Sequence, residues 1–165
     1  WQCLRMRVLP LSGFLTFVAV VSAFVGLLAV VLSSRALLGD EGPYIAAYMG
    51  AATVLVFAVP ESPLARPWPL VGGHLVSALV GVTCAQTIPD PALAAASAVA
   101  LAILAMQLLR CVHPPGGAAA MVAVIGGSDI RELGYLFVLW PVGLNVAVML
   151  IVSQLYARVA SRPDG

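Results

Sequence analysis

The residues of this chain best suited to chemistry fall in one stretch, from Arg110 to Ala120. Eight positions hold a cation, a titratable imidazole, two prolines and two glycines: Arg110, His113, Pro114, Pro115, Gly116 and Gly117. Because prolines cannot donate backbone hydrogen bonds, a helix arriving from Ala92 should end near Arg110, and a new one can begin at Pro115. The glycines allow close backbone approach and leave free N–H groups at the new helix start. This pattern predicts an anion site, although a rigid corner between two helices explains it equally well.

The composition identifies a membrane protein. Apolar residues make up 62% of the chain and charged residues only 9%, far from the balance of soluble domains. All eight basic residues are arginines, spread along the sequence, with a net charge of +1. A nucleic-acid surface would need clustered positive charge, so nucleic acid is excluded as a partner. The three cysteines lie far apart, without CxxC spacing, so no disulfide framework is expected.

Six apolar segments divide the chain into helices. Four are long enough to cross a bilayer, and two are too short or nearly so. The long segments are 13–33, 70–88, 92–109 and 135–156, and the short ones are 44–59 and 117–126. Polar or proline-rich turns separate them. We therefore predict an all-α membrane protein made of a single transmembrane domain, residues 1–165.

The arginines predict the topology. If all six segments cross from a cytoplasmic N-terminus, six arginines lie inside and two outside. The inside set is Arg5, Arg7, Arg66, Arg110, Arg158 and Arg162, and the outside set is Arg35 and Arg131. If the short segments dip and return instead, the count is four against four. The positive-inside rule favours six crossings, with both termini in the cytoplasm.

The order of segments repeats. A long segment, a short one that starts near a proline and another long one occur in 13–88 and again in 92–157. An odd number of crossings per unit makes the two units inverted relative to each other. Short, proline- or glycine-interrupted segments at matching places in two halves are typical of the central site of a transporter. We therefore predict an inverted 3+3 repeat.

Three motifs in order resemble the HPP family of integral membrane proteins, named for a His-Pro-Pro motif. They are Gly-Ala-Ala at 50–52 running to Pro-Glu-Ser-Pro-Leu-Ala-Arg-Pro at 60–67, Gly-His-Leu-Val-Ser-Ala at 73–78, and His-Pro-Pro-Gly-Gly-Ala at 113–118. The resemblance covers nearly the whole chain. It implies at least four transmembrane helices and, from plastid and cyanobacterial members, transport of nitrite.

Each candidate residue has a structural alternative. An ionisable group at membrane depth is a functional hypothesis by default, which favours His113, although at the interface it would simply brace the turn. His74 is equally suited to the transport path and to a hydrogen bond between helices. Arg110 would gather anions or mark the cytoplasmic end of a helix. Thr53 and Asn145 complete the set, and interhelical hydrogen bonds would explain both.

No cofactor or metal is expected. A zinc site from His74, His113 and Cys111 matches no ligand spacing. An intramembrane enzyme is also disfavoured, since the sequence has neither G-x-S-x-G nor H-E-x-x-H. We therefore expect a transporter or channel for a small inorganic anion, most plausibly nitrite, in a bacterial inner membrane. It would act as a homodimer in the lipid bilayer, with its site between the two halves. The alternative from another class is a non-transporting assembly or sensor subunit.

Overall fold

The computed structural model describes residues 13–39 and 42–160, and every regular element in them is helical. The elements in chain order are α1 (Gly13–Leu38), α2 (Gly42–Ala58), η2 (Pro63–Ala65), α3 (Pro67–Thr87), α4 (Pro91–Leu108), α5 (Pro114–Ile125), α6 (Ser128–Glu132), η3 (Val138–Gly143) and α7 (Leu144–Ala160). The prediction of an all-α protein is confirmed for these residues.

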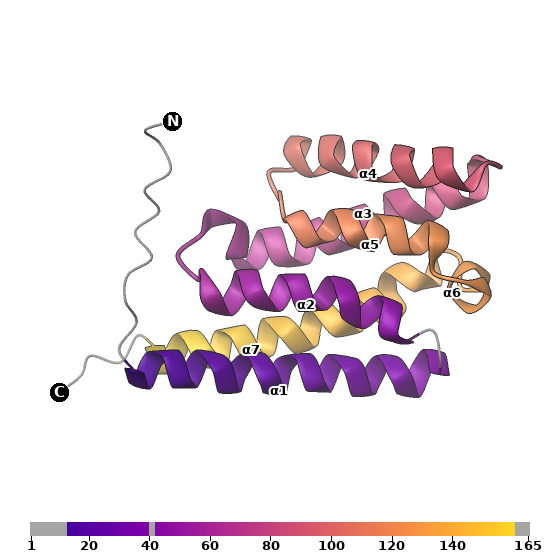
Figure 1. Cartoon of the computed structure of the whole chain (residues 1–165). Helices are drawn as coiled ribbons and strands as arrows, with labels where there is room; N and C mark the ends of the chain where they lie inside the picture. Colours follow the sequence, from indigo (N-terminus) through magenta and orange to yellow (C-terminus); the bar gives the residue numbers. More distant parts are fainter. Residues whose placement is uncertain (1–12, 40–41, 161–165) are drawn as a thin grey trace.

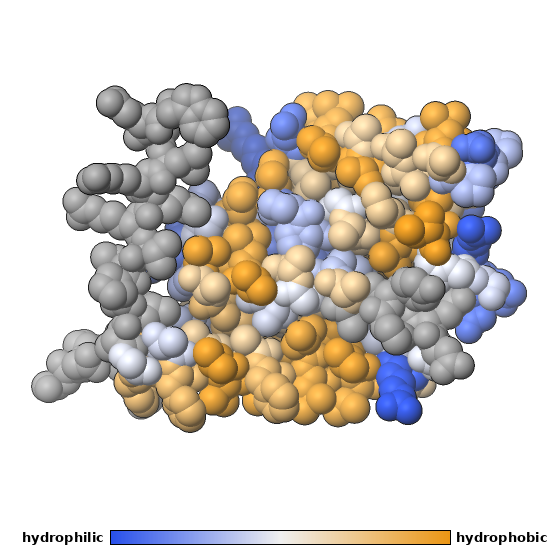
Figure 2. Space-filling view, in the orientation of Figure 1, coloured by the Kyte–Doolittle hydropathy of each residue, from blue (hydrophilic) through white to orange (hydrophobic). Residues whose placement is uncertain are grey.

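Four of the described helical stretches are long and apolar enough to cross a membrane: Gly13–Ala36, Pro67–Thr87, Pro91–Leu108 and Val138–Ala160. Two further apolar stretches, Ala47–Ala58 and Pro114–Ile125, are shorter. Hydrophobic side chains cover most of the face seen in Figure 2, and the most hydrophilic ones gather toward its two ends. This distribution is the one that a bilayer requires of a bundle whose helices cross it.

The helices run along one common direction and alternate in sense (Figure 1). In this view α1, α2, α5 and α4 follow one another from bottom to top, with α3 and α7 behind them. Helix α1 packs against α2 and α7, and α4 packs against α5 and α3. Helix α1 begins and α7 ends at the same end of the bundle, on the left of Figure 1.

Prolines start three of these helices, because a missing N–H costs nothing in the first turn. Pro67, Pro91 and Pro114 each occupy the first helical position of α3, α4 and α5. Asp90 adds a side-chain cap to α4, where its Oδ1 accepts a 2.7 Å hydrogen bond from the Leu93 N–H. The proline-rich turn between α3 and α4 therefore leads directly into a helix start.

Several predicted boundaries move. Helix α1 continues to Leu38, five residues beyond the expected end, and α5 begins one residue early, at Pro114. The polar segment that follows α5 contains the short helix α6. The last span is kinked at Trp140, whose backbone is extended (φ −145°, ψ 106°) just before Pro141.

Candidate functional site

The site is built where α3 and α5 come into backbone contact. A Cβ on Gly73 would lie 2.5 Å from the His113 Cβ, and a Cβ on Gly116 would lie 2.6 Å from the Gly73 carbonyl oxygen. About two turns further along the same face of α3, a Cβ on Gly81 would meet the backbone of Ala120. Only hydrogen fits at these points, which is how small residues bring membrane helices together. The small residues of α3 therefore form a buried face that packs against α5.

His113 stands at the start of α5 as its N-cap residue, and its side chain is fully buried. Its Nδ1 lies 2.9 Å from the Leu64 carbonyl oxygen, in the 3₁₀ turn η2. Ser62 shapes this turn, because its Oγ accepts a hydrogen bond from the Leu64 N–H. The proline-punctuated loop between α2 and α3 therefore holds the imidazole of a residue 49 positions further along the chain.

His74 lies beside His113 and is equally buried. Its Nδ1 is 2.8 Å from the Leu70 carbonyl oxygen, one turn earlier in α3. The centroids of the two imidazole rings are 4.8 Å apart, and the planes make an angle of 52°. The ring of Tyr48, from α2, lies 5.5 Å from that of His74 on a centroid basis. Three elements, α2, α3 and the start of α5, thus bring three aromatic rings together.

The hydrogen bonds fix the tautomer of both histidines. A carbonyl oxygen can only accept, so each Nδ1 must carry the hydrogen. In the neutral rings each Nε2 is then an acceptor with a free lone pair. Four buried side-chain atoms have no hydrogen-bond partner among the described residues: Tyr48 Oη, His74 Nε2, Ser77 Oγ and His113 Nε2. We call the four residues that carry these atoms the polar cluster.

Sequence reasoning found two members of the polar cluster and missed the other two. Ser77 follows His74 by three residues, so both lie on one face of α3. That spacing was the available signal, because a hydroxyl and an imidazole share the face that carries the glycines. Tyr48 sits inside a short apolar helix, away from the helix ends where membrane tyrosines gather, and this position is its signal.

The prolines and glycines of the His113 motif divide between the buried and exposed sides of α5. Pro115 and Gly116 are buried, whereas Pro114 is exposed and Gly117 is half-buried toward Val99 of α4. The Gly116 N–H donates a 2.8 Å hydrogen bond to the His113 carbonyl. The expectation of a free N–H group at Gly116 is therefore wrong, because this N–H already closes the first turn of α5. Pro114 and Pro115 have no N–H group to offer. Hydrogen bonding to a ligand falls to the side chains.

Comparison with known proteins identifies the group to which this architecture belongs. A family model described as HPP, transmembrane region, matches residues 11–164. The chain belongs to the HPP family. Two transmembrane proteins of Dictyostelium discoideum are each 35% identical to it, over 146 and 150 residues. Each alignment covers 86% of this chain and 47% or 52% of the relative.

The chain thus spans about half the length of these curated HPP relatives. No solved structure matches it. The HPP motif itself, residues 113–115, is the turn that places His113 in the polar cluster.

Arg110, which precedes the HPP motif, lies outside the polar cluster, and its side chain is exposed. It adopts φ 53°, the left-handed conformation that usually belongs to glycine after a helix end. The Cys111 N–H donates to the Met106 carbonyl at 2.9 Å, which closes the end of α4. The indole of Trp68 also donates to the Leu109 carbonyl at 3.1 Å. Arg110 therefore marks a helix terminus, and its part in gathering anions stays a prediction.

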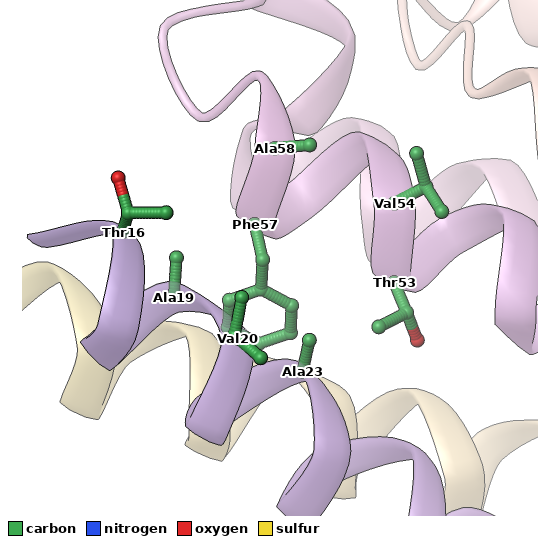
Figure 3. A pocket seen from close by; sticks show the side chains of 8 residues that line it. All are labelled: Thr16, Ala19, Val20, Ala23, Thr53, Val54, Phe57 and Ala58. Carbon is green, nitrogen blue, oxygen red and sulfur yellow. The ribbon is translucent and has the colours of Figure 1, made fainter. Parts of the chain in front are cut away.

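Thr53 lies apart from the polar cluster as well. Its Oγ1 donates a 2.8 Å hydrogen bond to the Met49 carbonyl, one turn earlier in α2. It lines a groove of about 310 Å³ between α1 and α2, together with Thr16, Ala19, Val20, Ala23, Val54, Phe57 and Ala58 (Figure 3). The groove is almost wholly apolar and opens toward exposed side chains such as Val20 and Val54. Its chemistry suits a hydrocarbon chain better than an anion.

Asn145 belongs to a second buried polar group, whose hydrogen bonds involve neither histidine. Its Nδ2 donates to Ser34 Oγ at 2.8 Å, and its Oδ1 accepts from Ser33 Oγ at 3.0 Å. These bonds join the end of α1 to the start of α7. Within the described residues, Asn145 therefore has partners for both ends of its amide, which is the interhelical role that the sequence left open.

The described residues include no group of three His, Cys, Asp or Glu side chains placed to hold a metal ion. Cys84 and Cys111 are free and buried. A Cβ on Gly72 would meet Cys111 Sγ at 3.2 Å, so this thiol packs against α3 near the polar cluster.

Proposed function

We propose that this HPP protein is a transporter or channel for a small inorganic anion, nitrite, rather than an enzyme. One observation carries the proposal: the polar cluster gathers four unpartnered polar atoms inside an apolar bundle.

The cost of these atoms supports a binding role. Leaving a buried polar group unsatisfied costs about 1–3 kcal/mol, so each of these atoms favours a polar partner. A polar solute that fills their hydrogen-bonding capacity would recover much of that cost. The polar cluster is therefore a place where an apolar protein gains by taking in a small polar species.

The packing supports an inverted repeat with the site between its halves. In the predicted repeat, α1, α2 and α3 correspond to α4, α5 and α7. Helix α1 packs against α2 and α7, and its counterpart α4 packs against their counterparts, α5 and α3. The paired helices run in opposite senses (Figure 1). Tyr48, His74 and Ser77 belong to the first unit and His113 to the second. The polar cluster lies away from the helix end, since His74 is about 10 Å along α3 from its start at Pro67, at 1.5 Å per residue.

Six crossings with both termini in the cytoplasm complete the proposal. Arg66, Arg110 and Arg158 stand at helix ends on one side of the bundle, and Arg35 and Arg131 on the other. This agrees with the positive-inside rule when the first side is cytoplasmic. We further propose a bacterial inner membrane as the location and a homodimer as the assembly. Cysteine-accessibility mapping of both ends and light scattering of the detergent-purified protein test these points.

Uptake into proteoliposomes tests the function directly. Purified protein is reconstituted, and entry of nitrite, nitrate, formate and chloride is compared with protein-free vesicles. We expect saturable nitrite entry that His113→Ala abolishes while its elution on size exclusion stays that of the wild type. Gln107→Ala, which alters an exposed residue of α4, is the matched control and should transport normally. Folded, inserted protein that moves none of the four anions would contradict the proposal.

A further inference from the structure

We propose that the anion crosses together with one proton, which is carried at the Nε2 atoms of the His74–His113 pair. This inference rests on the proposed function and adds its coupling. It follows from the direction of the hydrogen bonds, which no feature of the sequence predicts.

An anion such as nitrite brings only acceptor atoms. With each Nδ1–H committed to a carbonyl, of Leu70 for His74 and of Leu64 for His113, the neutral pair presents two further acceptors. Lone pairs facing an anion repel it. A proton on one Nε2 turns that atom into a charged donor, which is the partner that a buried anion requires. The hydroxyls of Tyr48 and Ser77 can add neutral donors, but neither balances the charge.

The surroundings offer no other compensating charge. The described acidic side chains and arginines all lie outside the buried core, and the chain contains no lysine. The other titratable groups near the pair are the Tyr48 phenol from α2, whose ring lies 5.5 Å from that of His74, and the Cys111 thiol, which packs against α3 at Gly72. Helices α4 and α5 and segment η3 contribute no further titratable side chain, and the Tyr156 ring of α7 packs on Phe57 instead. The imidazoles are therefore the groups able to supply positive charge.

The spacing limits the pair to one proton. The ring centroids lie 4.8 Å apart, so two imidazolium charges would repel strongly. At the effective dielectric of a protein, the second proton is disfavoured by roughly a hundredfold. The cycle then balances as follows: one proton binds Nε2 from the entry side, one anion accepts a hydrogen bond from that N–H, and both leave on the other side. No net charge crosses the membrane.

Two imposed gradients distinguish this cycle from simple anion passage. At equilibrium, electroneutral symport accumulates nitrite about tenfold per unit of pH difference, inside alkaline, and ignores the membrane potential. Uncoupled anion passage ignores the pH difference. It follows the membrane potential instead, which is imposed as a potassium diffusion potential with valinomycin. Initial rates are measured as the difference from protein-free vesicles, which removes passive entry of nitrous acid.

The inference predicts uptake that follows the pH gradient and not the potential. His113→Gln and His74→Gln keep a polar side chain but cannot take up the proton, so each should lower pH-driven uptake at least about tenfold. Gln107→Ala should leave it unchanged.

Wild-type uptake that follows the potential alone would overturn the inference and leave the proposed function standing. If neither gradient drives any protein-dependent uptake, both the inference and the proposed function are overturned. Full pH-driven uptake by both histidine variants would show that the pair does not carry the proton.

Discussion

A pair of adjacent glycines in α5 gives the sharpest test of the helix packing that forms the site. Gly116→Ala would place a Cβ 2.6 Å from the Gly73 carbonyl oxygen and 2.9 Å from Ser77 Oγ, so α3 and α5 must move apart. Gly117→Ala would meet only Val99 Cγ1, at 3.8 Å, an ordinary contact. Both variants gain the same helix propensity, about 1 kcal/mol for alanine over glycine. Their difference in stability therefore reports the clash alone.

Overpacking of this kind costs about 1–3 kcal/mol. We expect Gly117→Ala to be as stable as the wild type or more so, and Gly116→Ala to be less stable than Gly117→Ala by that amount. At about 2–4 °C per kcal/mol, the two melting temperatures should differ by roughly 2–12 °C.

The buried free thiols of Cys84 and Cys111 supply the assay. A thiol-reactive fluorescent dye reports their exposure on heating in detergent, in a Cys3→Ser background, because Cys3 lies outside the described residues. Equal melting temperatures for the two variants, or a more stable Gly116→Ala, would refute the close packing of α3 on α5.

Three further substitutions test local features, each by the same thermal assay. Arg110→Gly should raise stability by about 1 kcal/mol, since glycine adopts the left-handed conformation without the steric cost that arginine bears, and no gain would count against that conformation. Asn145→Ala should lower stability by about 1–3 kcal/mol because Ser34 loses its hydrogen-bond donor, whereas an unchanged melting temperature would contradict the link between α1 and α7. Asp90→Ala should cost about 1 kcal/mol through loss of the α4 cap to Leu93, while Asp90→Asn should keep it; equal losses would argue against capping.

The sequence predicts the helices well because each depends on a local pattern. Long apolar runs mark α1 and α3, and prolines mark the starts of α4 and α5. Helix α3 begins at Pro67, three residues before the predicted start at 70, because the loop prolines also suit the first turn of a helix. The kink at Trp140 follows from Pro141 in the same local way. The end of α1 was misplaced because Arg35 and its neighbours are polar yet remain compatible with a helix whose last turn is at the interface.

The composition of the site depends on contacts that local patterns do not contain. His74 and His113 meet because Gly73 and Gly116 let two helices touch, and the sequence gives no sign of which glycines pair. Tyr48 was missed for the same reason, since only packing brings α2 against His74.

Thr53 and Asn145 were proposed from residue type alone. In the structure Thr53 bonds to the Met49 carbonyl of its own helix, and Asn145 bonds to two serines of α1. Their place in a transport path stays a prediction.

The claim that the polar cluster binds the anion can be tested directly by nitrogen NMR of the two histidines, the only ones in the chain. Protein labelled with ¹⁵N-histidine, purified without a histidine tag and reconstituted in lipid, gives four ring-nitrogen signals. We expect both Nδ1 atoms to carry hydrogen throughout, and nitrite to shift the Nε2 signals, at least one of them toward the protonated form. Four ring signals that stay unchanged at saturating nitrite, in folded protein, would contradict an anion site at these residues.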